Sequence, residues 1–330
     1  MVAMGVFPAI YSTLSPQALI EGVLTKYELG AIDRCLFWNR GLSDIYLIET
    51  DNKPYILKVS HHHWRCRSDI QFELEFLDFL HQHSLPVANP LKTKKGRLFV
   101  TIRAVEGDRY AALFPYAPGE VPQGDLSTDQ SAIMGQTLGL LHQTSLKFEN
   151  ATPRQVLNLE YLLDDSLAVI SPYLGNRNQD LAYVADTISK IKQELICLEQ
   201  TSPLWSVCWG DPHSGNVHFT AENQITLFDF DQCGYGWRIF DIAKFLQVSL
   251  RAGISRKVRD AFFQGYQKIQ QLTDAETSSL QALTQMAHIW AWAISINAST
   301  IHNWSKLDTF YVNKHLNQLK KLSSQEWQLF

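Results

Sequence analysis

The chain has 330 residues, of which 45% are hydrophobic, and this is sufficient for two lobes around a buried interior. Its 29 basic and 33 acidic residues give a net charge of −4, without the positive excess typical of proteins that bind nucleic acid or anionic membranes. No apolar run reaches the ~18–20 residues of a membrane-spanning helix, the first residues lack a basic leader, and the five cysteines form no CxxC pair. We therefore expect a cytoplasmic protein without nucleic-acid or membrane partners.

The N-terminal third of the chain is predicted to form a helix and then a sheet. Ser15 and Pro16 form a helix start, and apolar residues at helical spacing predict a helix over 16–28. The following β-rich runs are separated by turn residues, and they lie at 34–38, 44–50, 54–60, 97–104 and 110–116. A helix over 68–83 interrupts them. We expect residues 1–116 to form a small lobe, a five-stranded antiparallel sheet plus a helix.

Beyond Pro118 and Gly119 the pattern is mostly helical, with one β-hairpin at 217–230. Helices are predicted at 129–146, 158–170, 179–199, 239–252, 256–270, 275–300 and 308–322. Residues 117–330 are therefore expected to form a larger helical lobe, which makes the chain an α+β protein of two lobes. Crevices between lobes are common ligand sites.

The most informative stretch is WGDPHSGN, followed by VHF, a turn and ITLFDFD. If the two short strands pair antiparallel with Val217 opposite Phe228, then Asn216 faces Asp229 with Cβ atoms about 5 Å apart. An amide oxygen and a carboxylate at that position suit Mg²⁺. Asp211 lies in the loop just before, where it could orient a hydroxyl and accept its proton. Such residues are also common in plain turns, but this loop leads into a hairpin that ends on a second acidic cluster.

These residues resemble the HGD-x-H-x-x-N and (I/V)-D-(F/W)-(D/E) signatures of the aminoglycoside phosphotransferase-like kinases. That group includes choline kinases, type II homoserine kinases and stress-response kinase A proteins. Three further segments resemble those of the family in its usual order: LGLLHQTS (138–145), DIAKF (241–245) and FFQGY (262–266).

The resemblance implies a protein kinase-like fold with ATP and Mg²⁺ as cofactors. By the same resemblance Asp211 is the catalytic base, and Asn216 and Asp229 are the Mg²⁺ ligands. Asp241 would brace the catalytic loop. The family usually has histidine where this chain has Trp209. An indole keeps bulk and one N–H donor, so the change affects the expected loop geometry more than the reaction type.

In the N-terminal lobe the resemblance implies a phosphate-binding lysine. Lys58, in PYILKVS, would contact the α- and β-phosphates, and Glu73 on the following helix would orient it through an ion pair. Glu75 faces another side of that helix and is the less suitable partner. The alternatives are a lysine that protects an edge strand and a glutamate on a solvated helix face.

Two loops complete the expected nucleotide site. NRGLSD, with Gly41 and Ser43, resembles the loop that covers the phosphates, although a plain hairpin turn explains it almost as well. FPYAPG resembles the hinge between lobes, where adenine would bond to the carbonyl of Pro115 and the N–H of Ala117. An ordinary strand-to-helix linker is the alternative.

Two groups of residues are expected to be structural. The histidines at 61–63, with Cys66 nearby, are typical of a surface loop more than of a metal site. The aromatic residues of the C-terminal helices are expected mainly in the core, although substrate sites of the family are built from these helices; they are Trp290, Trp292, Trp304 and Tyr311.

The leading hypothesis is transfer of the ATP γ-phosphate to a hydroxyl of a small molecule, such as an amino alcohol like homoserine, a choline-like compound or an aminoglycoside. A Ser/Thr protein kinase is the alternative, because NLEYLLDD (158–165) resembles stress-response kinase A proteins. The segment after Asp229 is, however, too short for a long activation loop. A third hypothesis is a catalytically weak nucleotide-binding regulator, which Trp209 favours and the retention of Asp211 opposes. The acceptor and the oligomeric state cannot be read from the sequence.

Overall fold

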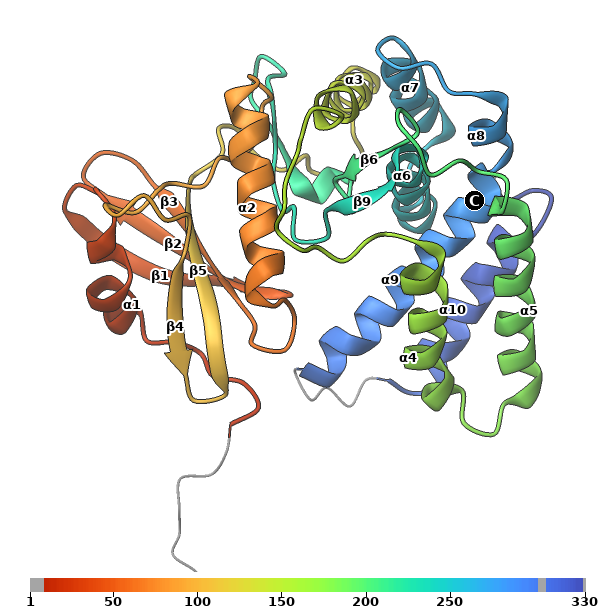
Figure 1. Ribbon diagram of the computed structural model, residues 1–330, viewed down its shortest axis with the longest axis horizontal. Helices are drawn as coiled ribbons and strands as arrows, with labels where there is room; N and C mark the ends of the chain where they lie inside the picture. The colour runs from red at the N-terminus through yellow and green to blue at the C-terminus, as the bar shows by residue number, and fades with distance from the viewer. Residues whose placement is uncertain (1–8, 302–306, 329–330) are drawn as a thin grey trace, which may run out of the picture.

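The computed structural model describes residues 9–301 and 307–328, and it has a sheet at one end and most helices at the other (Figure 1). The five strands are antiparallel in the order β1-β2-β3-β5-β4. Their bounds are Ile32–Arg40 (β1), Ser43–Thr50 (β2), Tyr55–Ser60 (β3), Val100–Ala104 (β4) and Gly107–Pro115 (β5). The expected small β-rich lobe and larger helical lobe are confirmed.

Two helices accompany the sheet. α1 (Pro16–Gly22) is capped by the Ser15 side chain, but it ends earlier than predicted and continues as a short 3₁₀ turn over Leu24–Lys26. Gly22 and the β-branched residues that follow it are poor helix formers, which accounts for the early end. α2 (Arg67–Gln82) begins with a capping box between Cys66 and Asp69, and it lies between the sheet and the helical lobe (Figure 1).

The helical lobe is organised around close contacts between helices. Its helices are α3 (Thr128–Ser145), α4 (Asp165–Leu174, after a π-helical turn over Glu160–Asp164), α5 (Asn178–Leu195), α6 (Arg238–Ala252), α7 (Arg256–Gln267), α8 (Asp274–Ser278), α9 (Leu280–Ile301) and α10 (Thr309–Leu322). A side chain at Gly265 of α7 would place its Cβ 2.1 Å from the carbonyl oxygen of Ala132 in α3. The glycine of the FFQGY segment is therefore required by packing.

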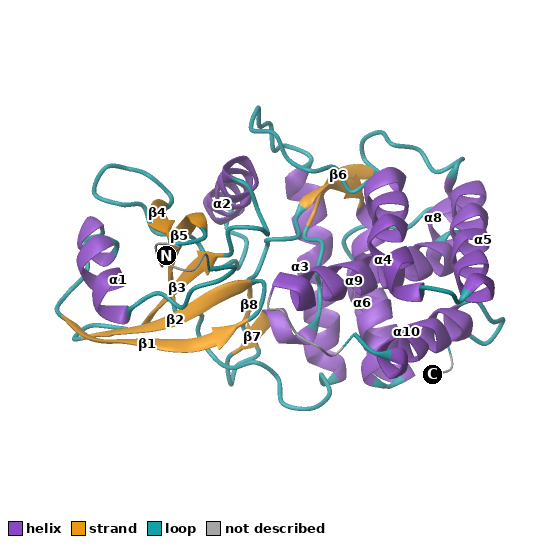
Figure 2. Cartoon of the chain, turned by 90° about the horizontal axis from the view of Figure 1, so that it is seen from below, coloured by secondary structure: helices purple, strands orange, loops and turns teal. Residues whose placement is uncertain are grey.

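Two short two-stranded sheets carry the segment with the acidic motifs. β6 (Trp205–Cys208) pairs with β9 (Gly234–Trp237) (Figure 1), and β7 (Val217–Phe219) pairs with β8 (Ile225–Leu227) (Figure 2). The β6–β9 sheet was not predicted, because strands of four residues are too short for a visible alternation of apolar residues. Among the described helices, none is long and apolar enough to cross a membrane.

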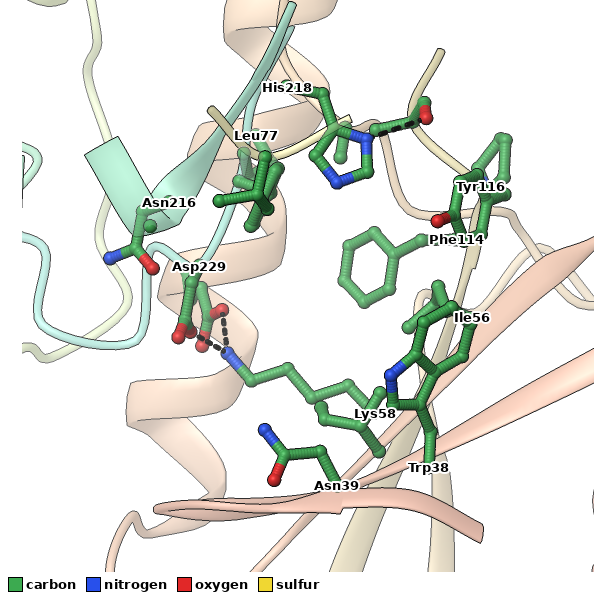
Figure 3. A pocket seen from close by; sticks show the side chains of 18 residues that line it. Trp38, Asn39, Ile56, Lys58, Leu77, Phe114, Tyr116, Asn216, His218 and Asp229 are labelled. Carbon is green, nitrogen blue, oxygen red and sulfur yellow. Dashed lines mark hydrogen bonds and ion pairs between the residues drawn. The ribbon is translucent and has the colours of Figure 1, made fainter. Parts of the chain in front are cut away.

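The predicted register of the β7–β8 hairpin is wrong by one residue. Val217 lies opposite Leu227, and the carbonyl of Asn216 accepts a hydrogen bond from the N–H of Phe228 (3.1 Å). Asp229 therefore follows the last paired residue instead of facing Asn216 across the ladder. It adopts a left-handed backbone conformation (φ 57°), and this turn, absent from the prediction, carries its side chain back toward Asn216 (Figure 3).

Candidate active site

A cavity of about 340 Å³ lies between the two lobes, and its two ends differ in character (Figure 3). One end is mainly apolar and includes Ile56, Leu77 and Phe114. The other end holds the charged and amide side chains, with Lys58 and Glu73 from the small lobe and Asn216 and Asp229 from the helical lobe. A slot of this kind suits a ligand with a flat apolar part and an anionic part.

Lys58 is held between two carboxylates. Its Nζ lies 3.0 Å from Glu73 Oε1 and 2.8 Å from Asp229 Oδ1, so the ion pair expected between β3 and α2 is present. Burial lowers the pKa of Lys58, but the charges of Asp229 and Glu73 raise the pKa by more, and the side chain remains an ammonium ion. Glu75 points elsewhere and accepts hydrogen bonds from Asn150 (2.7 Å) and Thr152 (2.9 Å).

Asn216 and Asp229 present oxygen atoms to the charged end of the cavity. The amide nitrogen of Asn216 donates to the backbone carbonyl of Asp211 (3.0 Å), which leaves the amide oxygen on the side of Asp229 (Figure 3). A carboxylate and an amide oxygen are the hard ligands that Mg²⁺ prefers, with waters and phosphate oxygens to complete its coordination. This pair therefore fits a divalent cation.

Asp211 lies beside this pair in the loop of residues 209–216. Its carboxylate is 3.3 Å from Lys244 Nζ and 3.5 Å from His213 Nε2, and it accepts a hydrogen bond from Gln232 (3.0 Å). Burial raises the pKa of Asp211, but the charge of Lys244 and the contact with His213 lower it by more, so the pKa lies well below its ordinary value. Asp211 is consequently an ionised carboxylate that can orient a donor.

The loop of residues 209–216 is held in place by Asp241 of α6. Asp241 is fully buried and accepts hydrogen bonds from the backbone N–H groups of Trp209 (2.7 Å) and Gly210 (2.8 Å). His142 of α3 contacts the same carboxylate (2.9 Å), and its other ring nitrogen meets the hydroxyl of Tyr266. This network links α3, α6 and α7 to the loop, as the bracing role expected for Asp241 requires.

Trp209 supports the pair formed by Asn216 and Asp229. Its ring stacks on Phe230, with centroids 5.3 Å apart, and its Nε1 donates to the backbone carbonyl of Asp229 (3.1 Å). The single N–H of the indole is therefore used to hold the left-handed turn at Asp229.

Of the residues in the two loops expected to contact a nucleotide, those of the hinge line the main cavity, and Gly41 and Ser43 do not. Pro115 and Ala117 line the apolar end of the cavity, and the carbonyl of Ala117 is hydrogen-bonded to Nδ1 of His218 (2.8 Å). Gly41 lies at the tip of the tight β1–β2 turn and is not part of the lining. Ser43 is buried and lines a small neighbouring cavity beside Lys58.

From the β1–β2 hairpin, the residues that line the main cavity are instead Trp38, Asn39 and Ile45. Trp38 is half-exposed, and its ring lies 5.8 Å from that of Tyr116, across the mouth of the apolar end (Figure 3).

Several side chains at the site were not predicted. Lys244 and Gln232 contact Asp211, and the indole of Trp64 donates to Asp231 (2.7 Å). The sequence does contain an indication for Lys244, because it is a cation within the buried apolar face of DIAKF and so needs an acidic partner. Gln232 and Trp64 carry no motif that identifies a partner so distant in the sequence.

The surface loop expected for the histidines at 61–63 is present only in part. His61 is buried, with Nε2 3.6 Å from Asp44, whereas His62 and His63 are exposed. Among the described residues, the cluster with metal-ligand spacing is His142, Cys208 and Asp241. It is fully buried, and its histidine and carboxylate are already occupied by the bracing hydrogen bonds.

Known proteins are similar to this chain along most of its length. The model of the phosphotransferase enzyme family matches residues 37–282. Uncharacterized protein sll1119 of Synechocystis sp. is 51% identical over 100% of this chain and 91% of its own length.

Two solved structures share the fold. The structure of amicoumacin kinase hAmiN in complex with AMP-PNP, Ca²⁺ and Ami has a TM-score of 0.78 at 21% identity, over 93% of this chain and 92% of that chain. The microcompartment-associated aminopropanol kinase has a TM-score of 0.75 at 19% identity, over 93% and 95% of the two chains. The kinase-like fold expected from the motifs is thereby confirmed.

Proposed function

Because the chain belongs to the phosphotransferase enzyme family, we propose that it transfers the γ-phosphate of Mg·ATP to a hydroxyl group of a small molecule. The observation that carries the proposal is the convergence of Lys58, Asn216 and Asp229 at the charged end of an apolar slot, with Asp211 beside them. The AMP-PNP and Ca²⁺ bound to amicoumacin kinase hAmiN support a nucleotide and a divalent cation here.

The nucleotide is proposed to lie along the cavity. Adenine occupies the apolar end, with the carbonyl of Pro115 and the N–H of Ala117 as hydrogen-bonding groups and Trp38 over the ring. The phosphates extend toward Lys58, whose ammonium is oriented by Glu73. A lysine fixed between carboxylates loses little conformational entropy when it binds phosphate.

The divalent cation would be held by Asn216 Oδ1 and the Asp229 carboxylate, and when bound it neutralises charge on the β- and γ-phosphate oxygens. Lys58 now contacts Asp229 directly (2.8 Å). Asp229 can therefore exchange part of its contact with Lys58 for the cation, and Lys58 becomes available to the nucleotide.

Asp211 is proposed to orient the acceptor hydroxyl. The acceptor oxygen forms a bond to the γ-phosphorus, the bond from that phosphorus to the β–γ bridging oxygen breaks, and the hydroxyl proton passes to the Asp211 carboxylate. Since Lys244 and His213 hold the pKa of Asp211 below its ordinary value, the carboxylate is a weak base. Its main contribution is therefore the alignment of the hydroxyl, with proton acceptance late in the reaction.

The two other hypotheses receive less support. The names of amicoumacin kinase and aminopropanol kinase favour a small-molecule acceptor over a protein. The hydrogen bond from Trp209 to the carbonyl of Asp229 supports the backbone of a proposed cation ligand. It therefore does not favour a regulator without catalysis.

The test is ATP consumption by wild-type protein and Asp211→Asn across a panel of amino alcohols, sugars and a generic protein substrate. We expect turnover with a small alcohol, nucleotide binding retained in Asp211→Asn, and a kcat lower by on the order of 10²–10⁴ in that variant. Near-wild-type turnover of Asp211→Asn would contradict the role of this residue, and turnover with the protein substrate alone would contradict the small-molecule acceptor.

A further inference from the structure

A second cavity, of about 470 Å³, shares no lining residue with the cavity proposed for the nucleotide. The segment between β3 and α2 lines it with Trp64 and Arg65, and the helical lobe lines it with Tyr161 and Asn297. The C-terminal end of α9 approaches the start of α2 here (Figure 1). The cavity is thus formed by both lobes, as an acceptor site between lobes requires.

Side chains in direct contact connect this cavity to Asp211. Lys244, 3.3 Å from Asp211, lies over the ring of Trp290 at 5.1 Å from its centroid. The ring of Tyr161, in the wall of the second cavity, is 6.0 Å from that of Trp290. Trp304, the other tryptophan considered for this side, lies outside the described residues.

The walls of this cavity carry one guanidinium, that of Arg65, and one carboxylate, that of Asp69. Arg65 is only 7% exposed, and its Nε has no hydrogen-bond partner among the described residues. The phenol of Tyr161 is its side-chain hydrogen-bond partner, and Asp231 acts on it through space. Of the ion pairs within the described part of the chain, none includes Arg65.

The nearby carboxylates are already occupied. Asp69 pairs with Arg154 (3.5 Å) and accepts a hydrogen bond from the N–H of Cys66 (3.2 Å), while Asp231 accepts from the indole of Trp64. A guanidinium that is desolvated without a direct counter-ion is costly. An oxyanion that enters the cavity would pair with the guanidinium that lines it and offset that cost.

We propose that the acceptor carries an oxyanion, a carboxylate or a phosphate, in addition to the hydroxyl that is phosphorylated, and that Arg65 binds this group. The inference rests on the proposed function, which it narrows: alcohols with only cationic groups, such as choline, lack the group that Arg65 requires. Tyr161 is placed to hold the guanidinium in position from the other lobe.

The experiment compares matched pairs of alcohols as substrates for Mg·ATP consumption. Homoserine is compared with 3-aminopropan-1-ol, which lacks only the carboxylate, and glycerol 3-phosphate is compared with glycerol. We expect the anionic member of one pair to have a kcat/KM at least about 10-fold higher than its partner, because a charge-assisted hydrogen bond is worth roughly that factor or more. The pair that responds identifies the oxyanion.

The variant Arg65→Gln should lower kcat/KM for that anionic substrate by roughly 10- to 100-fold, mainly through KM. It should lower the value for the partner alcohol by a smaller factor, so that the preference for the anionic member falls, and Arg65→Lys should retain part of the preference. Arg34→Gln removes an exposed arginine of β1 and serves as the control without effect. Thermal melting establishes whether each variant is folded. If Arg65→Gln is unfolded, the oxyanion inference is tested by the substrate preferences of Arg65→Lys and of the wild-type protein.

The inference is overturned if wild-type protein prefers the member without the anion in both pairs, uses the members equally, or consumes ATP with none of the four. It is also overturned if a folded Arg65→Gln keeps the wild-type preference. Mg²⁺-dependent binding of AMP-PNP is measured on the same preparations. Its absence in the wild-type protein would contradict the proposed function itself, whereas its presence confines the failure to the oxyanion site.

Discussion

Removal of the positive charge at Lys244 should change the pH range in which the protein works. Lys244 Nζ lies 3.3 Å from the Asp211 carboxylate, and the exposed fractions of the two side chains are 4% and 17%. At an effective dielectric constant of about 20, unit charges at this separation attract by about 5 kcal/mol. This value is an upper limit, because the burial of the ammonium costs part of it.

In Lys244→Met this attraction is lost while the length and apolar contact of the side chain beside Trp290 are kept. Burial raises the pKa of Asp211, and without the charge of Lys244 the contact with His213 remains to oppose this effect. A carboxylate whose pKa rises becomes protonated, and inactive, at a higher pH. We therefore expect kcat of the wild-type protein to be nearly constant between pH 5 and 8, and kcat of Lys244→Met to fall as the pH decreases through this range.

The assay is kcat for ATP consumption at saturating substrates across this pH range, with the folded fraction of each variant followed by circular dichroism. Lys257→Met, which removes an exposed lysine from α7, is the matched control. If folded Lys244→Met gave the same pH profile as the wild-type protein and the control, the electrostatic role of Lys244 would be refuted.

Three further variants test the support of the site and the stability of the fold. Asp241→Ala leaves two buried backbone N–H groups without an acceptor, at about 1–3 kcal/mol each, so the urea midpoint and kcat should both fall; an unchanged midpoint contradicts the bracing role. Trp209→Phe removes the donor to the Asp229 carbonyl and should weaken Mg²⁺-dependent nucleotide binding about 3- to 10-fold in calorimetry, with equal affinity as the refuting result. Burial lowers the pKa of His288 to about 4 and that of His315 to about 3. As the pH falls, each histidine is therefore protonated at a higher pH in the unfolded chain than in the folded chain. The free energy of unfolding should accordingly decrease as the pH falls from about 6.5 to 4. His288→Gln should reduce this slope in urea titrations, and an unaltered slope would exclude His288 as its source.

The two-lobe fold was predictable because its elements are long enough to show their periodicity. The apolar face of α2 repeats at helical spacing, and the strands of the sheet are separated by clear turn residues. The four-residue strands β6 and β9 show no such pattern. α1 was predicted too long, because the apolar spacing continues after Gly22 although the helix does not.

The site was predictable where a motif names both residue and role. Asn216 and Asp229 do lie together, but by a left-handed turn at Asp229 instead of the predicted strand register. The roles of Lys244 and Arg65 depend on contacts between elements that are distant in the sequence. Local patterns do not encode such contacts, so these residues became visible only in three dimensions.

The measurement that tests the central claim most directly is the affinity for AMP-PNP, by calorimetry, with and without Mg²⁺. Wild-type protein is expected to bind the nucleotide at least about 10-fold more tightly with Mg²⁺, and Asp229→Ala is expected to bind it equally under both conditions. If Asp229→Ala gained as much affinity from Mg²⁺ as the wild-type protein, the cation would not be held at Asn216 and Asp229, and the proposed centre would be wrong.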